Sequence, residues 1–427
     1  MNAPHHVPLS FHDVRQRLGF VDVDGVLQQT WELSAPSYAP DQLGFLDPSF
    51  VRQQCTAARL SRELTEATLD TAAALEDDPA LSRLAWHLHW LLFVNDEVAP
   101  TIRSWPRLPD QLGTIPPLCH LVVLLSGIPG MRQRHHELGL PESVTTECLV
   151  DFQVWADTWR RRFGDWGLFE VGWIYKSLRA ELFTLGRLQF ELAEFPFGHR
   201  LWRDTVTGHV LLLAQPDTPY RDDGLVDGTG DIHAERTWTA DYAETDDDVT
   251  GRVIDPRGRA TRKQVTLQKP RWKELLREGS PCSIFHIPAT GPLAPDAWHD
   301  SFRRAVSFFA EFFPDRPVPV YVSNSWLFDE KLERLVAPQS NIAAFLRGFY
   351  LFPVKRASDR QTLERAFGYR FNTVDDCPQD TSLQRRIVEL MRGGTRFNNA
   401  GALLVPELLD RGDTPYRDTV DPILEAP

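Results

Sequence analysis

The sequence predicts an α+β protein, in which an all-α N-terminal domain precedes a mixed, mostly antiparallel sheet flanked by helices. Apolar residues recur at helical spacing from about residue 48 to residue 163, and nothing before that point alternates like a strand. Further along, short alternating runs are separated by Gly- and Pro-rich turns, and Pro281–Phe313 is typical of a strand, a tight loop and an amphipathic helix. The expected divisions are an irregular segment (1–45), a helical domain (46–145) and a sheet-containing domain (146–427).

The N-terminal elements follow from the spacing of apolar residues. In the Pro-rich first segment only Phe11–Leu18 is expected to be helical. Gly164 is a plausible C-cap for the last helix before the second domain, because glycine adopts the left-handed conformation without strain. The other expected helices are Val51–Leu75, Ala80–Phe93, Leu118–Leu125, Met131–Leu138, Ser143–Phe163 and Gly167–Leu185, with a break at Pro100–Pro117.

The second domain is expected to contain more strands than helices. Asp246–Gly258 is expected to be a turn-rich loop, and the polar tail from Asp410 is expected to fray. The expected strands are Gly186–Phe195, His209–Pro216, Thr237–Thr245, Gln264–Leu267, Pro281–Ile287, Val318–Trp326 and Ala402–Pro406, with Ile342–Val354 mostly extended. The expected helices are Pro270–Arg277, the long helix that ends near Phe313, Asp329–Val336 and Thr381–Arg392.

Composition excludes several classes of function. With 427 residues and a formal net charge of −13, nonspecific nucleic-acid binding is not expected. The five cysteines are scattered and form no CxxC pair, which favours reduced thiols in a cytoplasm over disulfides or structural zinc. The N-terminus shows no signal-peptide pattern, and no apolar run approaches the ~20 residues of a membrane helix, so a cytoplasmic location without membrane contact is expected. The Asp-rich stretches lack the spacing of a calcium loop, and no metal is expected.

The strand, loop and helix of Pro281–Phe313 form a candidate anion site. The N-terminus of a helix presents unpaired backbone N–H groups and the positive end of the helix dipole. His286 lies near the end of the strand and could carry a proton at neutral pH. The same pattern also fits an ordinary βα unit of a core.

Several segments, in order along the chain, resemble one known family. They are LSGIPGMRQRHHELGLPESV (Leu125–Val144), GRLQFE (Gly186–Glu191), FHIPATGPL (Phe285–Leu293), SNSWLFDEKLERLVAPQSNI (Ser323–Ile342) and DTSLQR (Asp380–Arg385). Together they are similar to the GNAT-like acyltransferases, which join a helical N-acyltransferase N-terminal domain to a GNAT-like C-terminal domain. The resemblance implies acyl transfer from an acyl-thioester, with coenzyme A as the cosubstrate, to an amine of a small molecule or peptide in bacterial biosynthesis. It also implies two neighbouring parallel strands, Pro281–Ile287 and Val318–Trp326, that part around the thioester.

Three residues are the catalytic candidates. His286 is expected to be the general base or proton relay, and a structural histidine at the strand end is the alternative. Glu191 could bind the cationic amine or accept its proton, unless it serves as a surface carboxylate that pairs with Arg187. Ser325 is expected near the leaving sulfur.

The cofactor-binding candidates lie in the loop and at the end of the second strand. Pro292 has no N–H group, and the loop lacks the usual glycine pattern of GNAT enzymes, so a carrier-protein thioester or a shifted cofactor pose stays open. The expected cofactor-binding residues are Ile287, Ala289, Thr290, Gly291, Leu293, Asn324 and Trp326.

Two other functions remain open at this stage. The chain could be a noncatalytic acyl-CoA-binding or regulatory protein that kept the fold, or a structural partner in a biosynthetic complex. A homodimer is also possible.

Overall fold

The computed structural model describes residues 9–22, 25–40, 43–95, 105–106, 108, 112–113, 115–355, 364–368 and 373–426. The chain forms two compact units, residues 1–184 and 185–427. The sequence places the domain boundary near residue 145, which falls inside an unbroken helix, Glu142–Phe163. Cys148 on this helix contacts the carbonyl of Leu182 and the N–H of Thr184, so the helix is tied to the last residues of the first unit.

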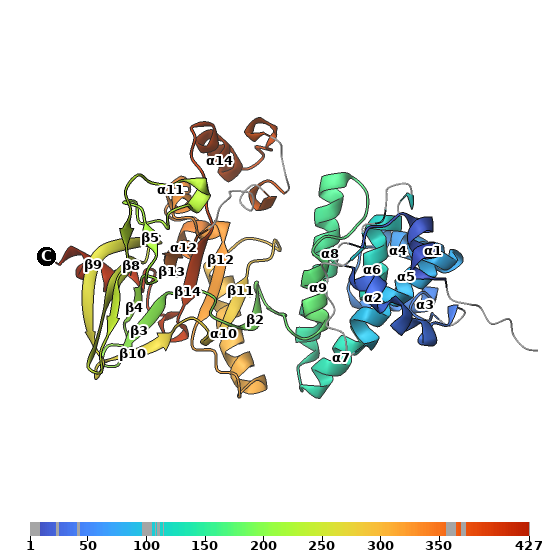
Figure 1. Ribbon diagram of the computed structural model, residues 1–427, viewed down its shortest axis with the longest axis horizontal. Helices are drawn as coiled ribbons and strands as arrows, with labels where there is room; N and C mark the ends of the chain where they lie inside the picture. The colour runs from blue at the N-terminus through green and yellow to red at the C-terminus, as the bar shows by residue number, and fades with distance from the viewer. Residues whose placement is uncertain are drawn as a thin grey trace, which may run out of the picture. The chain divides into compact units, whose positions relative to one another are not determined.

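The N-terminal unit is helical throughout its described residues, up to a short strand at its end (Figure 1). This confirms the all-α prediction for that part of the chain. The helices are α1 (Phe11–Leu18), α2 (Val26–Ser34), α3 (Pro48–Ala57), α4 (Arg62–Asp77), α5 (Pro79–His89), the π-helix η3 (Trp90–Val94), α6 (Ile115–Leu125), α7 (Ile128–Glu137), α8 (Glu142–Phe163) and α9 (Val171–Leu178).

Helix ends in this unit follow local capping chemistry. Gly164 closes α8 with a φ of 85°, as expected. The single helix expected over Val51–Leu75 is wrong, because Arg59 takes a positive φ of 53° and Ser61 starts α4 by accepting from the N–H of Leu64. The first segment is not irregular beyond α1, because it holds α2. The helix expected up to Leu185 ends early, and strand β1 (Phe183–Leu185) follows it.

Among the described residues, burial lowers the pKa of five histidines, His87, His89, His120, His135 and His199, to about 3 or 4, so they are neutral in the folded protein. His87 is fully buried between Ser34 and Thr30, and burial, together with the charge of Arg83, lowers its pKa to about 3. Burial and Arg134 lower the pKa of His135 to about 4. In the C-terminal unit, burial lowers the pKa of His199 to about 3.

These histidines predict a loss of stability in mild acid. Above pH ~6.5 they are neutral in both folded and unfolded states and contribute nothing. As the pH falls from 6.5 towards 4, the unfolded chain binds protons that the folded chain cannot, so each histidine should lower the free energy of unfolding by about 1.4 kcal/mol per pH unit. We expect the melting temperature to fall steadily between pH 6.5 and pH 4.5, and the His135→Gln variant to show a shallower slope. An unchanged melting temperature across this range would contradict the burial of neutral histidines.

The C-terminal unit contains two sheets and a small strand pair. The first sheet has the order β1-β2-β11-β12-β14-β13, with β2 (Leu188–Glu194), β11 (Pro281–His286), β12 (Tyr321–Ser325), β14 (Ala400–Leu404) and β13 (Tyr350–Pro353). The second has the order β10-β3-β4-β8-β7, with β10 (Trp272–Leu276), β3 (Arg200–Asp204), β4 (Val210–Leu213), β8 (Asp248–Asp255) and β7 (Tyr242–Glu244), and β9 (Arg259–Gln268) pairs with β8. The small pair is β5 (Pro219–Tyr220) with β6 (Trp238–Thr239). The α+β prediction is confirmed.

Most helices of this unit flank the first sheet or connect its strands, and the last one, α15 (Arg417–Glu425), packs on β8 of the second sheet. The longest, α10, begins at Pro295 and covers the sheet with Phe302, which packs on Phe190, Phe285 and Tyr321. The others are α11 (Lys331–Leu335), α12 (Asn341–Arg347), α14 (Ser382–Arg392) and α15 (Arg417–Glu425). The helix of Thr381–Arg392 is confirmed within one residue, and Thr381 provides its capping box.

Several local predictions in this unit are wrong for tertiary reasons. The loop expected over Asp246–Gly258 contains β8, and the helix expected over Pro270–Arg277 is β10, which pairs with β3. The extended segment expected over Ile342–Val354 begins with α12 before β13. The tail expected to fray after Asp410 forms α15 instead.

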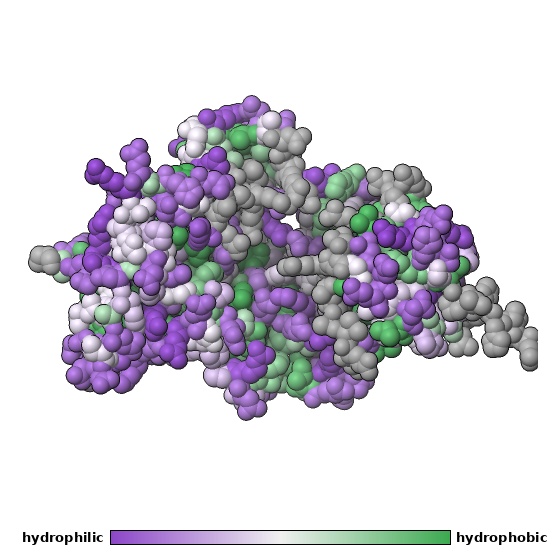
Figure 2. All heavy atoms as spheres, in the orientation of Figure 1, coloured by the Kyte–Doolittle hydropathy of each residue, from purple (hydrophilic) through white to green (hydrophobic). Residues whose placement is uncertain are grey.

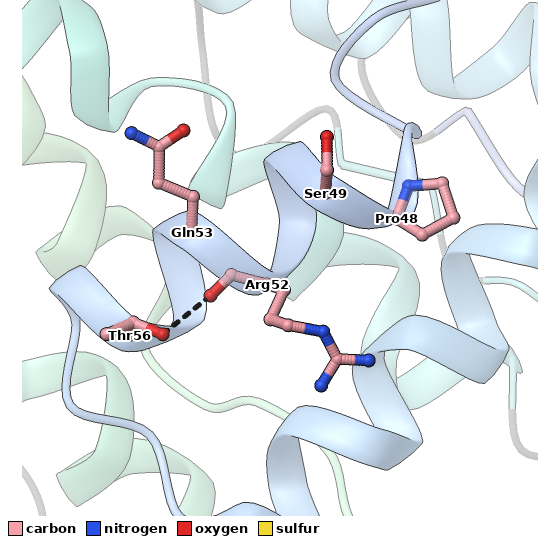
Figure 3. A pocket seen from close by; sticks show the side chains of 5 residues that line it. All are labelled: Pro48, Ser49, Arg52, Gln53 and Thr56. Carbon is pink, nitrogen blue, oxygen red and sulfur yellow. Dashed lines mark hydrogen bonds between the residues drawn. The ribbon is translucent and has the colours of Figure 1, made fainter.

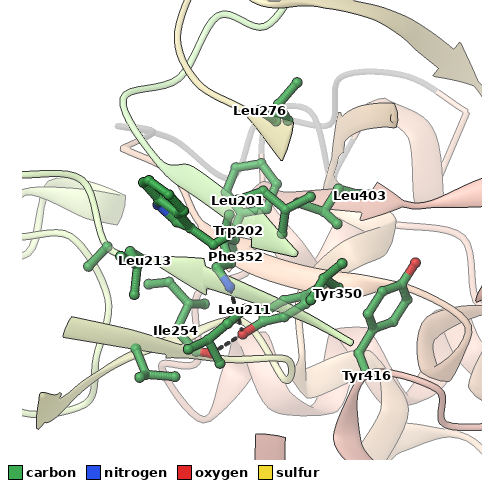
Figure 4. Close-up of a cluster of buried hydrophobic side chains, with 14 of the residues drawn as sticks. Leu201, Trp202, Leu211, Leu213, Ile254, Leu276, Tyr350, Phe352, Leu403 and Tyr416 are labelled. Atoms are coloured by element: carbon green, nitrogen blue, oxygen red, sulfur yellow. Dashed lines mark hydrogen bonds between the residues drawn. The ribbon is translucent and has the colours of Figure 1, made fainter. Parts of the chain in front are cut away.

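A hydrophobic core lies between the two sheets of this unit (Figure 4). Leu211, Leu213 and Ile254 from the second sheet meet Tyr350 and Phe352 from the first (Figure 4). The Tyr350 hydroxyl donates to the carbonyl of Ile254 at 2.6 Å and accepts from the N–H of Leu212 at 3.3 Å, so a polar group in this core is satisfied. The first sheet is therefore fixed from both sides, by α10 and by the second sheet.

All five cysteines are buried, and none forms a disulfide.

Among the described residues, no helix combines the length and apolar character needed to cross a membrane. The face of the C-terminal unit shown in Figure 2 is mainly hydrophilic, with apolar side chains in small areas.

Candidate active site

The site is built where two parallel strands of the first sheet part. β11 and β12 pair only at Ser283 with Tyr321 and at Ile284 with Val322. Beyond these positions β11 continues along β2 as far as His286, and β12 continues along β14 as far as Ser325. Over their last residues, β11 and β12 are therefore no longer paired with each other. This opening is the arrangement that the family resemblance predicts for a thioester site.

His286 and Glu191 meet across β11 and β2. His286 is paired with Gln189 and Ile284 with Glu191, so the imidazole and the carboxylate are diagonal neighbours on one face of the sheet. The distance from His286 Nε2 to Glu191 Oε1 is 3.0 Å, and both side chains are largely buried, with 22% and 14% of their surface exposed. When Nε2–H donates to the carboxylate, Nδ1 carries the lone pair that can accept a proton. The structure thus brings together two of the three catalytic candidates.

Asn324 and Ser325 point to opposite faces of β12, because successive side chains alternate. Asn324 is two residues after Val322, which belongs to the core between the sheets, so it shares the sheet face of Cys282 and His286. Its Oδ1 atom is buried and has no hydrogen-bond partner among the described residues. Ser325 lies on the other face.

Ser325 starts a short helical turn. Its Oγ accepts the N–H of Leu327 at 3.3 Å, which caps the 3-10 helix η7 (Trp326–Phe328). The hydroxyl proton of Ser325 remains available to a further acceptor. Trp326 begins this turn and is half-buried.

The loop between β11 and α10 exposes unpaired backbone donors. Ala289, Thr290 and Gly291 are exposed, whereas Leu293 is buried and anchors the loop. Their four N–H groups donate to no acceptor among the residues that the structure describes. Ile287 is half-buried and precedes this run. Since α10 begins soon afterwards at Pro295, these unpaired donors lie beside a helix N-terminus, the end of a helix at which negative charge is favoured.

Arg187 holds this loop, a role that the sequence pattern does not indicate. Its guanidinium donates to the carbonyls of Pro288 (2.8 Å), Gly291 (2.7 Å) and Pro292 (3.1 Å) and to Thr290 Oγ1 (3.4 Å). The alternative in which Arg187 pairs with Glu191 is not what the structure shows. No spacing in the sequence signals the true contact, because its partners lie more than a hundred residues further along the chain.

A narrow cavity borders Phe328 of η7 and Ala400, the β14 partner of Ser325. Two larger cavities lie away from the candidate residues. One is a shallow depression along α3, lined by Pro48, Ser49, Arg52, Gln53 and Thr56, whose hydrogen bond from Thr56 Oγ1 to the Arg52 carbonyl is internal to the helix (Figure 3). The other, of 320 Å³, is lined by Arg257, Glu330, Glu333, Arg334, Pro338, Arg347 and Arg417. Its charges are already paired, for example by the two hydrogen bonds between Arg417 and Glu333. Across the described ranges, no group of three or more metal-ligating side chains comes together.

Comparison with known proteins gives a consistent result. Residues 182–404 match the family described as GNAT-like C-terminal domain, and residues 49–180 match the N-acyltransferase N-terminal domain. Solved structures with the same fold include an acyltransferase with CoA and 10C-teicoplanin (TM-score 0.64), one with decanoyl-CoA and teicoplanin (0.63) and a mutant acyltransferase with octanoyl-CoA (0.63). Each is 21% identical to this chain, and the match covers 93% of this chain and 99% of the other. No curated protein matches the chain.

Proposed function

Because the chain belongs to the GNAT-like N-acyltransferase family, we propose that this acyltransferase moves an acyl group from acyl-CoA to the amine of a small molecule or peptide. The amine nitrogen attacks the thioester carbonyl carbon, the C–S bond breaks, and an amide and a CoA thiol are formed. The proton lost by the amine passes to a base, and the thiolate takes up a proton as it leaves.

The observation that carries this proposal is the pair of His286 and Glu191 at the opening between β11 and β12. Glu191 orients the imidazole through Nε2, and His286 is proposed to accept the amine proton at Nδ1. A carboxylate at this position also favours the approach of a cationic amine. The pair thus supplies both the base and the group that orients it.

The donor is proposed from the loop and from the solved relatives. Four unpaired N–H groups next to a helix N-terminus suit the pyrophosphate of CoA. Related structures contain octanoyl-CoA and decanoyl-CoA, which supports a medium-length acyl chain as the first donor to test. Asn324 is proposed to accept a hydrogen bond from a pantetheine amide through its unpartnered Oδ1, and Ser325 to donate its hydroxyl proton to the leaving sulfur.

The acceptor is proposed to be an amine, and teicoplanin is a rational first probe because an acyltransferase of the same fold is bound to it. The experiment incubates the purified protein with acyl-CoAs of two to sixteen carbons and follows thiol release with and without amine acceptors. We expect release that depends on both partners and a product whose mass increases by one acyl group. Binding of acyl-CoA without amine-dependent release would instead support the noncatalytic binding protein, which the glycine-poor loop favours.

A further inference from the structure

We propose that Arg187 is a positioning residue that shapes the donor loop 288–292 and thereby turns its backbone N–H groups towards the pyrophosphate of acyl-CoA. This inference rests on the proposed function. Arg187 lies in the turn before β2 and is not proposed to contact the acyl group or the amine. Its role would explain why the donor loop needs only one glycine.

The contacts of the guanidinium are concentrated on this one loop. Arg187 binds three loop carbonyls and one hydroxyl between 2.7 and 3.4 Å, so one side chain determines the orientation of successive peptide groups. Among the described residues no carboxylate lies within ion-pair distance of Arg187, although its burial lowers its pKa. Its positive charge is therefore balanced only by carbonyl dipoles and remains available to attract an anion bound to the loop.

The geometry of the peptide group links this clamp to the anion site. In a trans peptide the C=O of one residue and the N–H of the next point in opposite directions, and the structure contains no cis peptide among its described residues. With the Pro288 carbonyl drawn to Arg187, the N–H of Ala289 points away from the guanidinium. The Pro292 carbonyl also accepts from Arg187, so the N–H of Leu293 points away from the guanidinium as well. The clamp also removes three partially negative oxygens from the side on which a phosphate would bind.

Arg187 is itself held in place by the helix that follows the loop. The backbone N–H groups of Arg187 and Leu188 both donate to Ser301 Oγ, at 2.7 and 3.2 Å. Ser301 is fully buried on α10, and its hydroxyl donates to the carbonyl of Ala297. The turn before β2, the loop and the first turns of α10 are thus locked into one unit.

This arrangement explains how the loop can work with few glycines. Glycine-rich phosphate loops aim their N–H groups by adopting backbone conformations that other residues avoid. Here only Gly291 has an unusual φ, of 149°, and two of the clamped carbonyl groups, of Pro288 and Pro292, belong to prolines. In this protein the side chain of Arg187 therefore orients the peptide groups that glycine conformations orient in glycine-rich loops.

The test compares Arg187→Ala and Arg187→Lys with an Arg303→Ala control, whose guanidinium is exposed on α10 and pairs with Asp410. Each protein is assayed with an acyl-CoA and with the matching acyl-pantetheine, which keeps the thioester but lacks the pyrophosphate. Arg187→Ala should raise KM for acyl-CoA roughly 10- to 100-fold, the range found for residues that orient ligand contacts, with little change in kcat. KM for acyl-pantetheine should stay unchanged. Arg187→Lys should be intermediate, because it keeps the charge but not the four directed bonds.

An equal rise in KM for acyl-CoA and for acyl-pantetheine in Arg187→Ala would overturn this role for Arg187. An unchanged KM for acyl-CoA would overturn it as well. Calorimetry with CoA and with pantetheine separates this inference from the proposed reaction. A wild-type protein that binds CoA without turnover would refute the reaction, and the CoA affinity of the variants would still decide the role of Arg187. If Arg187→Ala does not fold, the Arg187→Lys variant decides by the same comparison of donors.

Discussion

Replacing His286 with alanine is expected to lower turnover of acyl-CoA and amine by roughly 10²–10⁴-fold, the usual contribution of a positioned acid or base. The imidazole is the only titratable group that β11 places at the opening beside β12, and its partner Glu191 lies 3.0 Å away. Affinity for CoA should change little, since the donor loop is held by Arg187 instead. Steady-state kinetics and CoA calorimetry on the same preparation measure both quantities.

Two further variants make this result specific. His209→Ala removes an exposed histidine at the start of β4 and should retain full turnover. Glu191→Gln keeps a hydrogen-bond acceptor for His286 but loses the charge, so it should mainly weaken the binding of cationic acceptors. If His286→Ala lowers the melting temperature while the folded protein keeps its turnover, His286 is a structural residue and the base must be sought elsewhere.

Replacing Gly291 with glutamate should weaken CoA binding by about a hundredfold. A φ of 149° strains any residue with a Cβ atom, although the space around this position is open. The larger effect is electrostatic, because a carboxylate several ångströms from a pyrophosphate at a partly exposed site costs about 3 kcal/mol, roughly two orders of magnitude in affinity. Titration calorimetry with CoA at low and high salt would show the loss and its partial recovery as the repulsion is screened.

A matched control exists at the other end of β11. Gly279 also has a positive φ, of 79°, and no atom lies within 4 Å of the place that a Cβ atom would take, but this glycine is in the turn before the strand. Gly279→Glu therefore introduces the same kind of strain and the same charge away from the donor loop, and it should leave CoA affinity intact. Gly291→Ala isolates strain from charge and should cost less than Gly291→Glu. Unchanged CoA affinity in a folded Gly291→Glu variant would place the donor site elsewhere.

The sequence is most informative where local pattern and tertiary structure agree. The spacing of Trp298, Phe302 and Phe309 predicts α10, and these side chains are buried in the structure. Gly164 and Thr381 mark helix ends through backbone conformation and capping, which need no distant partner. The strand, loop and helix around His286 are predictable for the same reason.

Distant contacts decide the elements that local pattern does not predict. Trp272–Leu276 has helical spacing, but its pairing with β3 makes it a strand. β8 carries several charged and turn-forming residues, although its half-buried and buried residues alternate over most of its length. In the site, the alternation of side chains along β12 is enough to separate Asn324 from Ser325. The link from Arg187 to the donor loop depends on the pairing of β2 with β11, which no local pattern reveals.

The clamp of Arg187 joins residues that are 101 to 105 positions apart in the chain. A contact across this length of chain costs loop-closure entropy that helix-forming contacts do not, so it forms together with the pairing of β2 and β11 and not on its own. The donor loop can therefore bind CoA only in molecules whose first sheet has formed. CoA should bind these molecules in preference to partly folded ones and so stabilise them. A saturating donor at about a hundred times its Kd would raise the free energy of unfolding by about 2.7 kcal/mol. Thermal-shift screening with CoA fragments is thus a direct test, because a fragment raises the melting temperature only if it binds the folded protein.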